Sequence, residues 1–142
     1  CHFNVLDWWG TASLKKWIRY GYESYTGVKN TSLYVQCWAN VMRHGEKIES
    51  HNHGPSGNHV KEEHCLCGHL GVQVDESTST YYEGKPILNK NGAMSFFPSY
   101  TNHWTDRYLG SSERITLAFD INSQEYFDYD MCDEAKKHWV QI

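Results

Sequence analysis

The strongest constraint on the fold of this chain is a two-residue alternation of apolar and polar side chains in two long segments. In residues 33–42 every second side chain is apolar, and the same alternation returns in residues 114–121. Successive side chains of a β-strand point to opposite faces, so the spacing predicts two strands, each with one apolar face. The other face of the first strand carries Gln36, Trp38 and Asn40, a mixture that suits the lining of a pocket. In the last strand, Arg114 and Thr116 share the face opposite the apolar one.

Shorter strand-like segments lie between these two. Residues 66–74 and 93–98 have strand patterns, whereas residues 75–80 are expected to form a loop and residues 84–92 further turns around Pro86. Several short strands separated by turns indicate an all-β sandwich or barrel. The chain has 142 residues and shows no linker, repeat or low-complexity segment, so a single domain over 1–142 is predicted.

Both ends of the chain are expected to support this β core, which spans residues 33–121. Within residues 1–32 a helix is predicted, capped by Thr11 or Ser13, because apolar side chains recur at helical spacing at Leu14, Trp17, Ile18, Tyr22 and Tyr25. The helix is expected to pack on a sheet, and the alternative is an aromatic surface for sugars or a partner protein. The tail, 122–142, is expected to be helical near its end, over residues 132–140. The aromatic ends could also support a homodimer.

Composition excludes several classes of protein. The net charge of −4 gives no basic face for nucleic acid, and no apolar run approaches the roughly 20 residues that cross a membrane. The first residues lack the pattern of a signal peptide, and five irregularly spaced cysteines suit a reducing compartment, so a cytoplasmic protein is expected. Cys65 and Cys67 leave one residue between them, fewer than zinc-binding pairs do, and buried thiols are predicted instead.

The chemistry of the chain is concentrated in three places. His51 and His53 follow the first strand and, being two apart in an extended segment, point the same way. His103 is expected in a loop after a later strand, and Arg114 and Thr116 begin the last strand. Imidazole is a ligand for iron, zinc, copper and nickel, so the histidines predict a metal site.

These residues resemble a known pattern, that of the Fe(II)- and 2-oxoglutarate-dependent oxygenases, which have a His-x-Asp or His-x-Glu pair, a distal histidine and a basic residue about ten positions later. The segments CWANVMRHGEKIESHNH, LCGHLGVQV and NGAMSFFPSYTNHWTDRYLGSSERITLAFDI are similar to a small prolyl-hydroxylase-like subgroup that includes marine phage members. The resemblance implies a double-stranded β-helix, or jelly-roll, over residues 33–121. It implies a protein that is cytoplasmic, or virion-associated if phage-encoded.

The same resemblance implies a site and an activity. His51, His53 and His103 would bind Fe(II), while 2-oxoglutarate and dioxygen would occupy the remaining positions of a hydroxylase. Arg114 would hold the distal carboxylate of 2-oxoglutarate with help from Thr116. Asn40 and Trp38 would line the cosubstrate site. The substrate is not specified, and the short chain favours an open mouth that accepts a protein or other polymer.

His53 departs from the oxygenase pattern, in which the second ligand is a carboxylate. Either three histidines bind the metal, or Glu62, Glu63 or Asp106 completes the ligand set. The spacing of Gly45, His51-x-His53, Gly92, Pro98 and His103 also resembles the two cupin motifs, which share the jelly-roll. Two alternatives therefore remain: a three-histidine cupin dioxygenase that needs no 2-oxoglutarate, and a non-catalytic jelly-roll binding or virion-associated module with a relict metal site.

Overall fold

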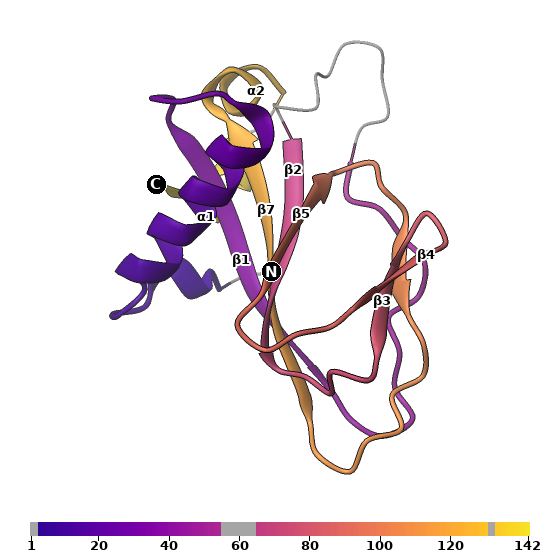
Figure 1. Cartoon of the computed structure of the whole chain (residues 1–142). Coiled ribbons are helices and arrows are strands. Elements are labelled where there is room, and N and C mark those ends of the chain that lie inside the picture. Colours follow the sequence, from indigo (N-terminus) through magenta and orange to yellow (C-terminus); the bar gives the residue numbers. More distant parts are fainter. Residues whose placement is uncertain (1–2, 55–64, 131–132) are drawn as a thin grey trace.

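The fold is built from two antiparallel sheets and a helix, seen in a computed structural model that describes residues 3–54, 65–130 and 133–142 (Figure 1). The larger sheet has the strand order β5-β2-β7-β1-β8 and the smaller one β4-β3-β6. The elements in chain order are η1 (Val5–Asp7), α1 (Ala12–Thr26), β1 (Leu33–Met42), β2 (Cys65–Gln73), β3 (Ser79–Tyr82), β4 (Lys85–Leu88), β5 (Met94–Pro98), β6 (His103–Thr105), β7 (Arg114–Ser123), α2 (Gln124–Asp130), α3 (Asp133–Lys136) and β8 (Val140–Gln141).

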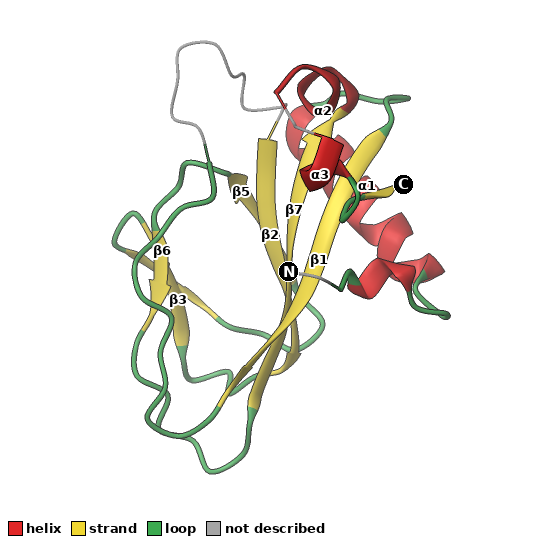
Figure 2. Ribbon diagram, turned by 180° about the vertical axis from the view of Figure 1, so that it is seen from behind, coloured by secondary structure: helices red, strands yellow, loops and turns green. Residues whose placement is uncertain are grey.

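The main hydrophobic core lies between the larger sheet and α1. Figures 1 and 2 show α1 against one face of this sheet and the smaller sheet on the other side. The expected helix is confirmed, and it contributes the fully buried Ile18 and Tyr22 to the core. Most of the other buried residues of this core come from the apolar faces predicted for the two long strands. They are Leu33, Val35, Cys37, Phe119 and Ile121.

The opposite face of the larger sheet is the polar one. β1 and β7 pair along their whole length, which places Asn40 beside Thr116 and Met42 beside Arg114. The core between α1 and the sheet covers only the first half of β1. There Leu33, Val35 and Cys37 are buried, whereas Ala39 and Val41, on the same face of the strand, are exposed. Over its second half, β1 therefore turns its better covered side toward the smaller sheet.

Two short strands replace what the sequence predicted as a loop and turns. Ser79 and Thr80, expected in a loop, begin β3, and residues 85–88 form β4, which pairs with β3 as a hairpin. Pro86 is compatible with β4 because this strand lies at the edge of its sheet, where a missing N–H disturbs no ladder. His103, also expected in a loop, begins strand β6, which is only three residues long.

The ends of the chain also differ from the predictions. The face of α1 predicted to pack on the sheet is narrower than expected, because Trp17 and Tyr25 are exposed. Thr11 occupies the N-cap of α1 but donates its hydroxyl to the carbonyls of Leu6 and Trp8 rather than capping the helix. The tail is helical earlier than expected, at 124–130 and 133–136, and its last residues pair with β1 as β8. None of the described helices is long and apolar enough to cross a membrane.

Candidate metal centre

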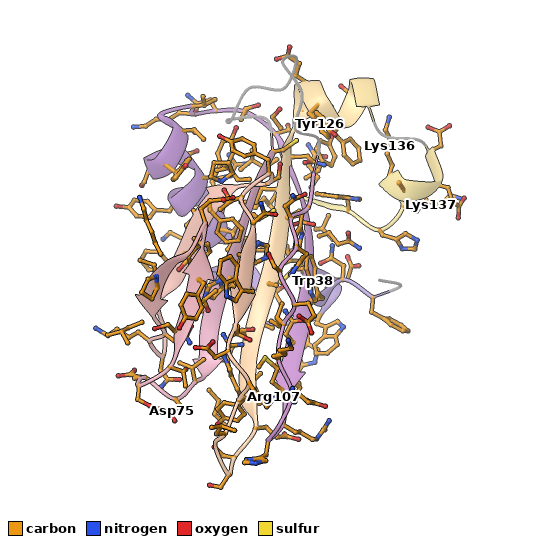
Figure 3. The ribbon with its side chains drawn as sticks, turned by 90° about the vertical axis from the view of Figure 1, so that its right-hand side faces the viewer. Trp38, Asp75, Arg107, Tyr126, Lys136 and Lys137 are labelled. Atoms are coloured by element: carbon orange, nitrogen blue, oxygen red, sulfur yellow. The ribbon has the colours of Figure 1, made fainter. Side chains whose placement is uncertain are left out.

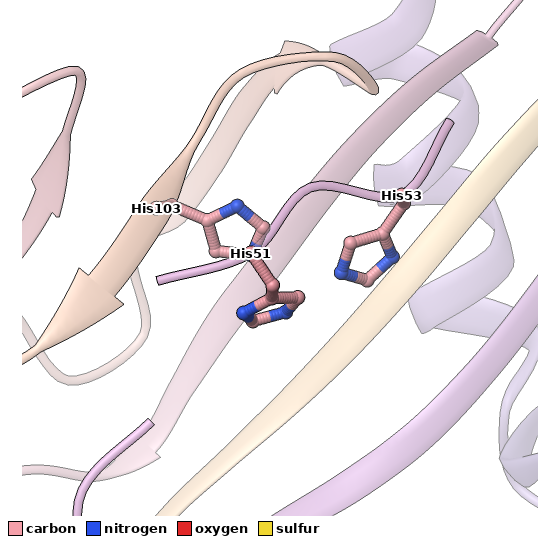
Figure 4. Close-up of side chains that lie close together, drawn as sticks. All are labelled: His51, His53 and His103. Carbon is pink, nitrogen blue, oxygen red and sulfur yellow. The ribbon is translucent and has the colours of Figure 1, made fainter. Parts of the chain in front are cut away.

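Backbone pairing brings the three predicted histidines together. His51 and His103 form an antiparallel bridge, in which each backbone N–H donates to the other's carbonyl at 3.2 and 2.9 Å. Two residues later, the N–H of His53 donates to the carbonyl of Ser99 at 2.8 Å. The segment that carries His51 and His53 therefore runs beside β6, and all three rings converge on one point (Figure 4).

The geometry of the three rings suits a metal ion. Their centroids lie 4.3 to 5.2 Å apart, and one ring nitrogen from each lies within 4.8 Å of the others. The Nδ1 atoms of His51 and His103 donate to the carbonyls of Glu49 and Thr101, at 2.8 and 3.0 Å. Because a carbonyl can only accept, Nδ1 carries the hydrogen in both rings and the lone pair of the neutral ring lies on Nε2.

His53 follows the same arrangement, and its Nε2 atom is the observation that best tests the fit of a metal ion. Its Nδ1 contacts Oδ1 of Asp120 at 2.8 Å, whereas Nε2 is buried and has no hydrogen-bond partner among the described residues. Buried polar atoms are almost always satisfied, so an orphaned nitrogen aimed at two other imidazoles fits a metal ion. Burial lowers the pKa of His103, which keeps that ring neutral and able to bind a metal.

All seven residues predicted for the site line one cavity of about 150 Å³, between the two sheets. The three histidines and Trp104 line it together with the polar faces of β1 and β7, which contribute Trp38, Asn40, Arg114 and Thr116. Trp38 stacks on the ring of His53, with centroids 5.8 Å apart. Figure 3 shows Trp38 between the end of the molecule that carries Tyr126 and the end that carries Asp75 and Arg107.

Arg114 is the most unusual residue in this cavity. It is 3% exposed, and its contacts are long ones to neutral atoms: Sδ of Met42 at 3.6 Å, Oγ1 of Thr80 at 3.4 Å and Oδ1 of Asn89 at 3.5 Å. Within residues 3–54, 65–130 and 133–142, no carboxylate forms an ion pair with it. Burial lowers its pKa, and the planar fork of donors on a guanidinium has the geometry that suits a carboxylate or other anion.

Asp106, one of the carboxylates proposed to replace His53, does not join the three histidines. Asp106 is exposed and accepts a hydrogen bond from the Tyr81 hydroxyl at 2.7 Å. Glu62 and Glu63 lie outside the described residues. Cys65 and Cys67 are buried, as the sequence predicted.

Two residues of the site were missed by the sequence analysis. Asp120 contacts both His53 and Cys67, and its place on the polar face of β7, shared with Arg114 and Thr116, was the signal available. His69 also lines the cavity, where its Nδ1 pairs with the Tyr82 hydroxyl at 3.0 Å. Burial, reinforced by the charge of Arg114, lowers the pKa of His69 to about 4, so this ring is neutral near pH 7.

Comparisons with known proteins bear on the fold. No protein family and no curated protein matches the sequence. The non-heme monooxygenase ThoJ in its nickel complex aligns with 75% of this chain and 49% of its own, at 12% identity and a TM-score of 0.55. An RmlC-like cupin from Shewanella frigidimarina aligns at 13% identity, 66% and 71% coverage and a TM-score of 0.46. The DMSP lyase DddQ from Ruegeria pomeroyi aligns at 17% identity, 70% and 41% coverage and a TM-score of 0.44. Identities this low show the fold alone, and with the two antiparallel sheets the predicted jelly-roll is confirmed.

Proposed function

We propose that this protein is a non-haem Fe(II)- and 2-oxoglutarate-dependent dioxygenase that acts as a hydroxylase. His51, His53 and His103 would hold the iron through Nε2, and Arg114 with Thr116 would hold the distal carboxylate of 2-oxoglutarate. When bound, iron and 2-oxoglutarate together activate dioxygen for hydroxylation of a C–H bond, with 2-oxoglutarate converted to succinate and carbon dioxide.

The observation that carries this proposal is the buried Arg114 in the same cavity as the histidines. A guanidinium presents a planar fork of donors that matches a carboxylate, and it costs several kcal/mol to bury without a partner. Its acceptors among the described residues are neutral and distant, which leaves its donors suited to an anion. A dicarboxylate that reaches the metal with one end can contact Arg114 with the other.

Other residues of the cavity would position the cosubstrate. Thr116, which is 3% exposed, adds a hydroxyl beside Arg114, and Asn40 is its partner across the β1–β7 pair. Neutral His69 adds a hydrogen-bonding group without adding a charge. Trp38, stacked on His53, limits the movement of that ring and shields it from water.

The test is anaerobic addition of Fe(II) and then 2-oxoglutarate to the metal-free protein, followed by visible spectroscopy. The proposal predicts the weak charge-transfer band of iron chelated by 2-oxoglutarate, and formation of succinate after air is admitted. Arg114→Met should abolish the band at moderate 2-oxoglutarate concentration while leaving Fe(II) binding intact. Absence of both band and succinate in the wild-type protein refutes the proposal.

A second candidate is a three-histidine cupin dioxygenase that uses no 2-oxoglutarate. The observation in its favour is the ligand set, since imidazoles alone converge on the site within the described part of the chain. Under this alternative, Arg114→Ala leaves oxygen-dependent turnover unchanged. Metal binding with no turnover at all instead indicates a binding module that retains only the site.

A further inference from the structure

The three histidines differ in the group that accepts the hydrogen on Nδ1. His51 and His103 use backbone carbonyls, which are neutral. His53 uses Oδ1 of Asp120, a carboxylate, at 2.8 Å. A carboxylate behind a metal-binding imidazole fixes its orientation and makes it a more basic ligand, and losing such a partner typically lowers metal affinity about 10- to 100-fold.

Strand pairing places Asp120 beside His53 and Cys67. On β7, Asp120 pairs with Gln36 of β1 on one side and with Cys67 of β2 on the other. Residues that pair directly across strands point to the same face of a sheet, so these three side chains lie on the face turned away from α1. The Cys67 thiol donates to the same oxygen, Oδ1, at 3.0 Å. The side chains of His53 and Asp120 are only 17% and 21% exposed, so their interaction is partly shielded from solvent.

We propose that Asp120 is a positioning residue of the metal centre, which directs Nε2 of His53 at the metal and supplies the negative charge that three neutral imidazoles lack. This inference rests on the proposed metal site and deepens it. In a set of three histidines, the bound ion keeps its full positive charge. A carboxylate hydrogen-bonded to one of the ligands offsets part of this positive charge, though less than a directly bound carboxylate would. The attraction is greater for the more oxidised ion, so that ion is stabilised more.

The same atoms could be taken for a second metal site, because His53, Cys67 and Asp120 offer ligand atoms within 4.8 Å of one another. The hydrogen bonds argue against it. Nδ1 of His53 and Sγ of Cys67 both direct their hydrogens at one carboxylate oxygen, so neither atom is in the deprotonated form that binds a metal. Burial, together with the charge of Asp120, also raises the pKa of the Cys67 thiol. A metal there would have to displace both protons.

The experiment compares Asp120→Asn, Asp120→Glu and Asp106→Asn with the wild-type protein. Asp120→Asn keeps an oxygen that can accept from His53 but removes the charge, and Asp120→Glu keeps the charge. Asp106→Asn removes an equal charge from an exposed carboxylate that contacts Tyr81 and not the histidines. For each protein, anaerobic Fe(II) binding is measured by titration calorimetry, and the midpoint potential of the bound iron by spectroelectrochemistry. Circular dichroism of the metal-free proteins monitors folding.

We expect Asp120→Asn to weaken Fe(II) binding about 10- to 100-fold and to raise the midpoint potential. Asp120→Glu should keep a potential close to that of the wild-type protein even if its affinity falls, and Asp106→Asn should match the wild type in both. If wild type binds one Fe(II) per chain but Asp120→Asn leaves affinity and potential unchanged, the role of Asp120 is refuted while the metal site stands. Two ions per chain, with one lost in Cys67→Ala, would overturn it in favour of a second site. No binding by the wild type would overturn the metal site itself.

Discussion

Replacing Arg114 with methionine should make the metal-free protein more stable while it removes the binding of 2-oxoglutarate. The guanidinium is 3% exposed, and its three contacts, at 3.4 to 3.6 Å, are longer than the 2.7–2.9 Å typical of charged hydrogen bonds. A buried charge with so little compensation costs several kcal/mol, and methionine is an unbranched apolar side chain that can follow much of the same path.

The stability gained by removing the buried charge can be compared with the cost of the hydrogen bonds and the packing that Arg114→Met removes. Thr80 and Asn89 keep partners without Arg114, because the Thr80 hydroxyl donates to Oδ1 of Asn89 at 2.8 Å and Nδ2 of Asn89 donates to Thr78 at 2.9 Å. The smaller side chain leaves a void that costs about 1 kcal/mol. Replacing buried ionic groups with apolar ones gains about 1–4 kcal/mol, so after the cost of the void a net stabilisation of about 0–3 kcal/mol is expected. In a chain of this size the upper end corresponds to a rise in Tm of about 10 °C.

The assay is thermal unfolding by calorimetry, first without metal and then with a redox-inert divalent ion and 2-oxoglutarate. At a ligand concentration of about 100 times Kd the wild-type protein should gain about 2.7 kcal/mol from 2-oxoglutarate, and Arg114→Met should gain nothing. Arg43→Met is the control, because Arg43 pairs with Glu113 at 3.0 Å on the surface and should change stability by less than about 0.5 kcal/mol. A lower Tm for metal-free Arg114→Met would show that Arg114 is satisfied within the protein, and the argument for an anionic cosubstrate would fail.

Three further predictions concern the histidines and the packing of α1. The pKa of His69 is lowered from 6.5 to about 4, so the unfolded chain takes up a proton at this residue at higher pH than the folded protein does. The free energy of unfolding should therefore be at its full value above pH 6.5 and should fall by about 3 kcal/mol as the pH drops toward 4. In urea unfolding, His69→Gln should make the free energy of unfolding less dependent on pH over that range. His103→Ala should abolish the rise in Tm that a divalent metal produces, whereas His44→Ala, at an exposed site, should retain it. Gly21→Ala places a Cβ 2.0 Å from Cζ of Phe96 and should cost about 1–3 kcal/mol, and adding Phe96→Ala should make that cost much smaller in a double-mutant cycle.

The long strands could be predicted because each carries its own pattern. The alternation in residues 33–42 and 114–121 predicted both β1 and the start of β7, and it also separated the face packed on α1 from the face that lines the cavity. The two-residue spacing of His51 and His53 likewise predicted rings that point the same way, and they do. These features depend only on the direction in which side chains point along a single strand, and residue spacing in the sequence determines that direction.

The short strands could not be predicted in this way. β6 has three residues and β4 has four exposed ones, too few to show an alternation. They are strands because of what they pair with: β6 with β3 and, at His103, with His51. The contact of Asp120 with Cys67 has the same origin, since it follows from the register of β2 against β7. Register between distant segments is set by the whole fold rather than by either segment.

The division of the larger sheet into two faces explains how a small protein tolerates so costly a cavity. Phe119 and Asp120 are neighbours in sequence but lie on opposite faces: Phe119 is fully buried in the core, and Asp120 contacts His53. Most of the apolar burial is placed on the α1 side, where it stabilises the fold whether or not a ligand is bound. The cavity side carries Arg114, whose contacts among the described residues are long ones to neutral atoms, and Nε2 of His53, which has no hydrogen-bond partner there; both are expected to lower the stability of the free protein. Metal and anion should therefore stabilise this protein strongly, because each relieves a cost that is already present in the free state.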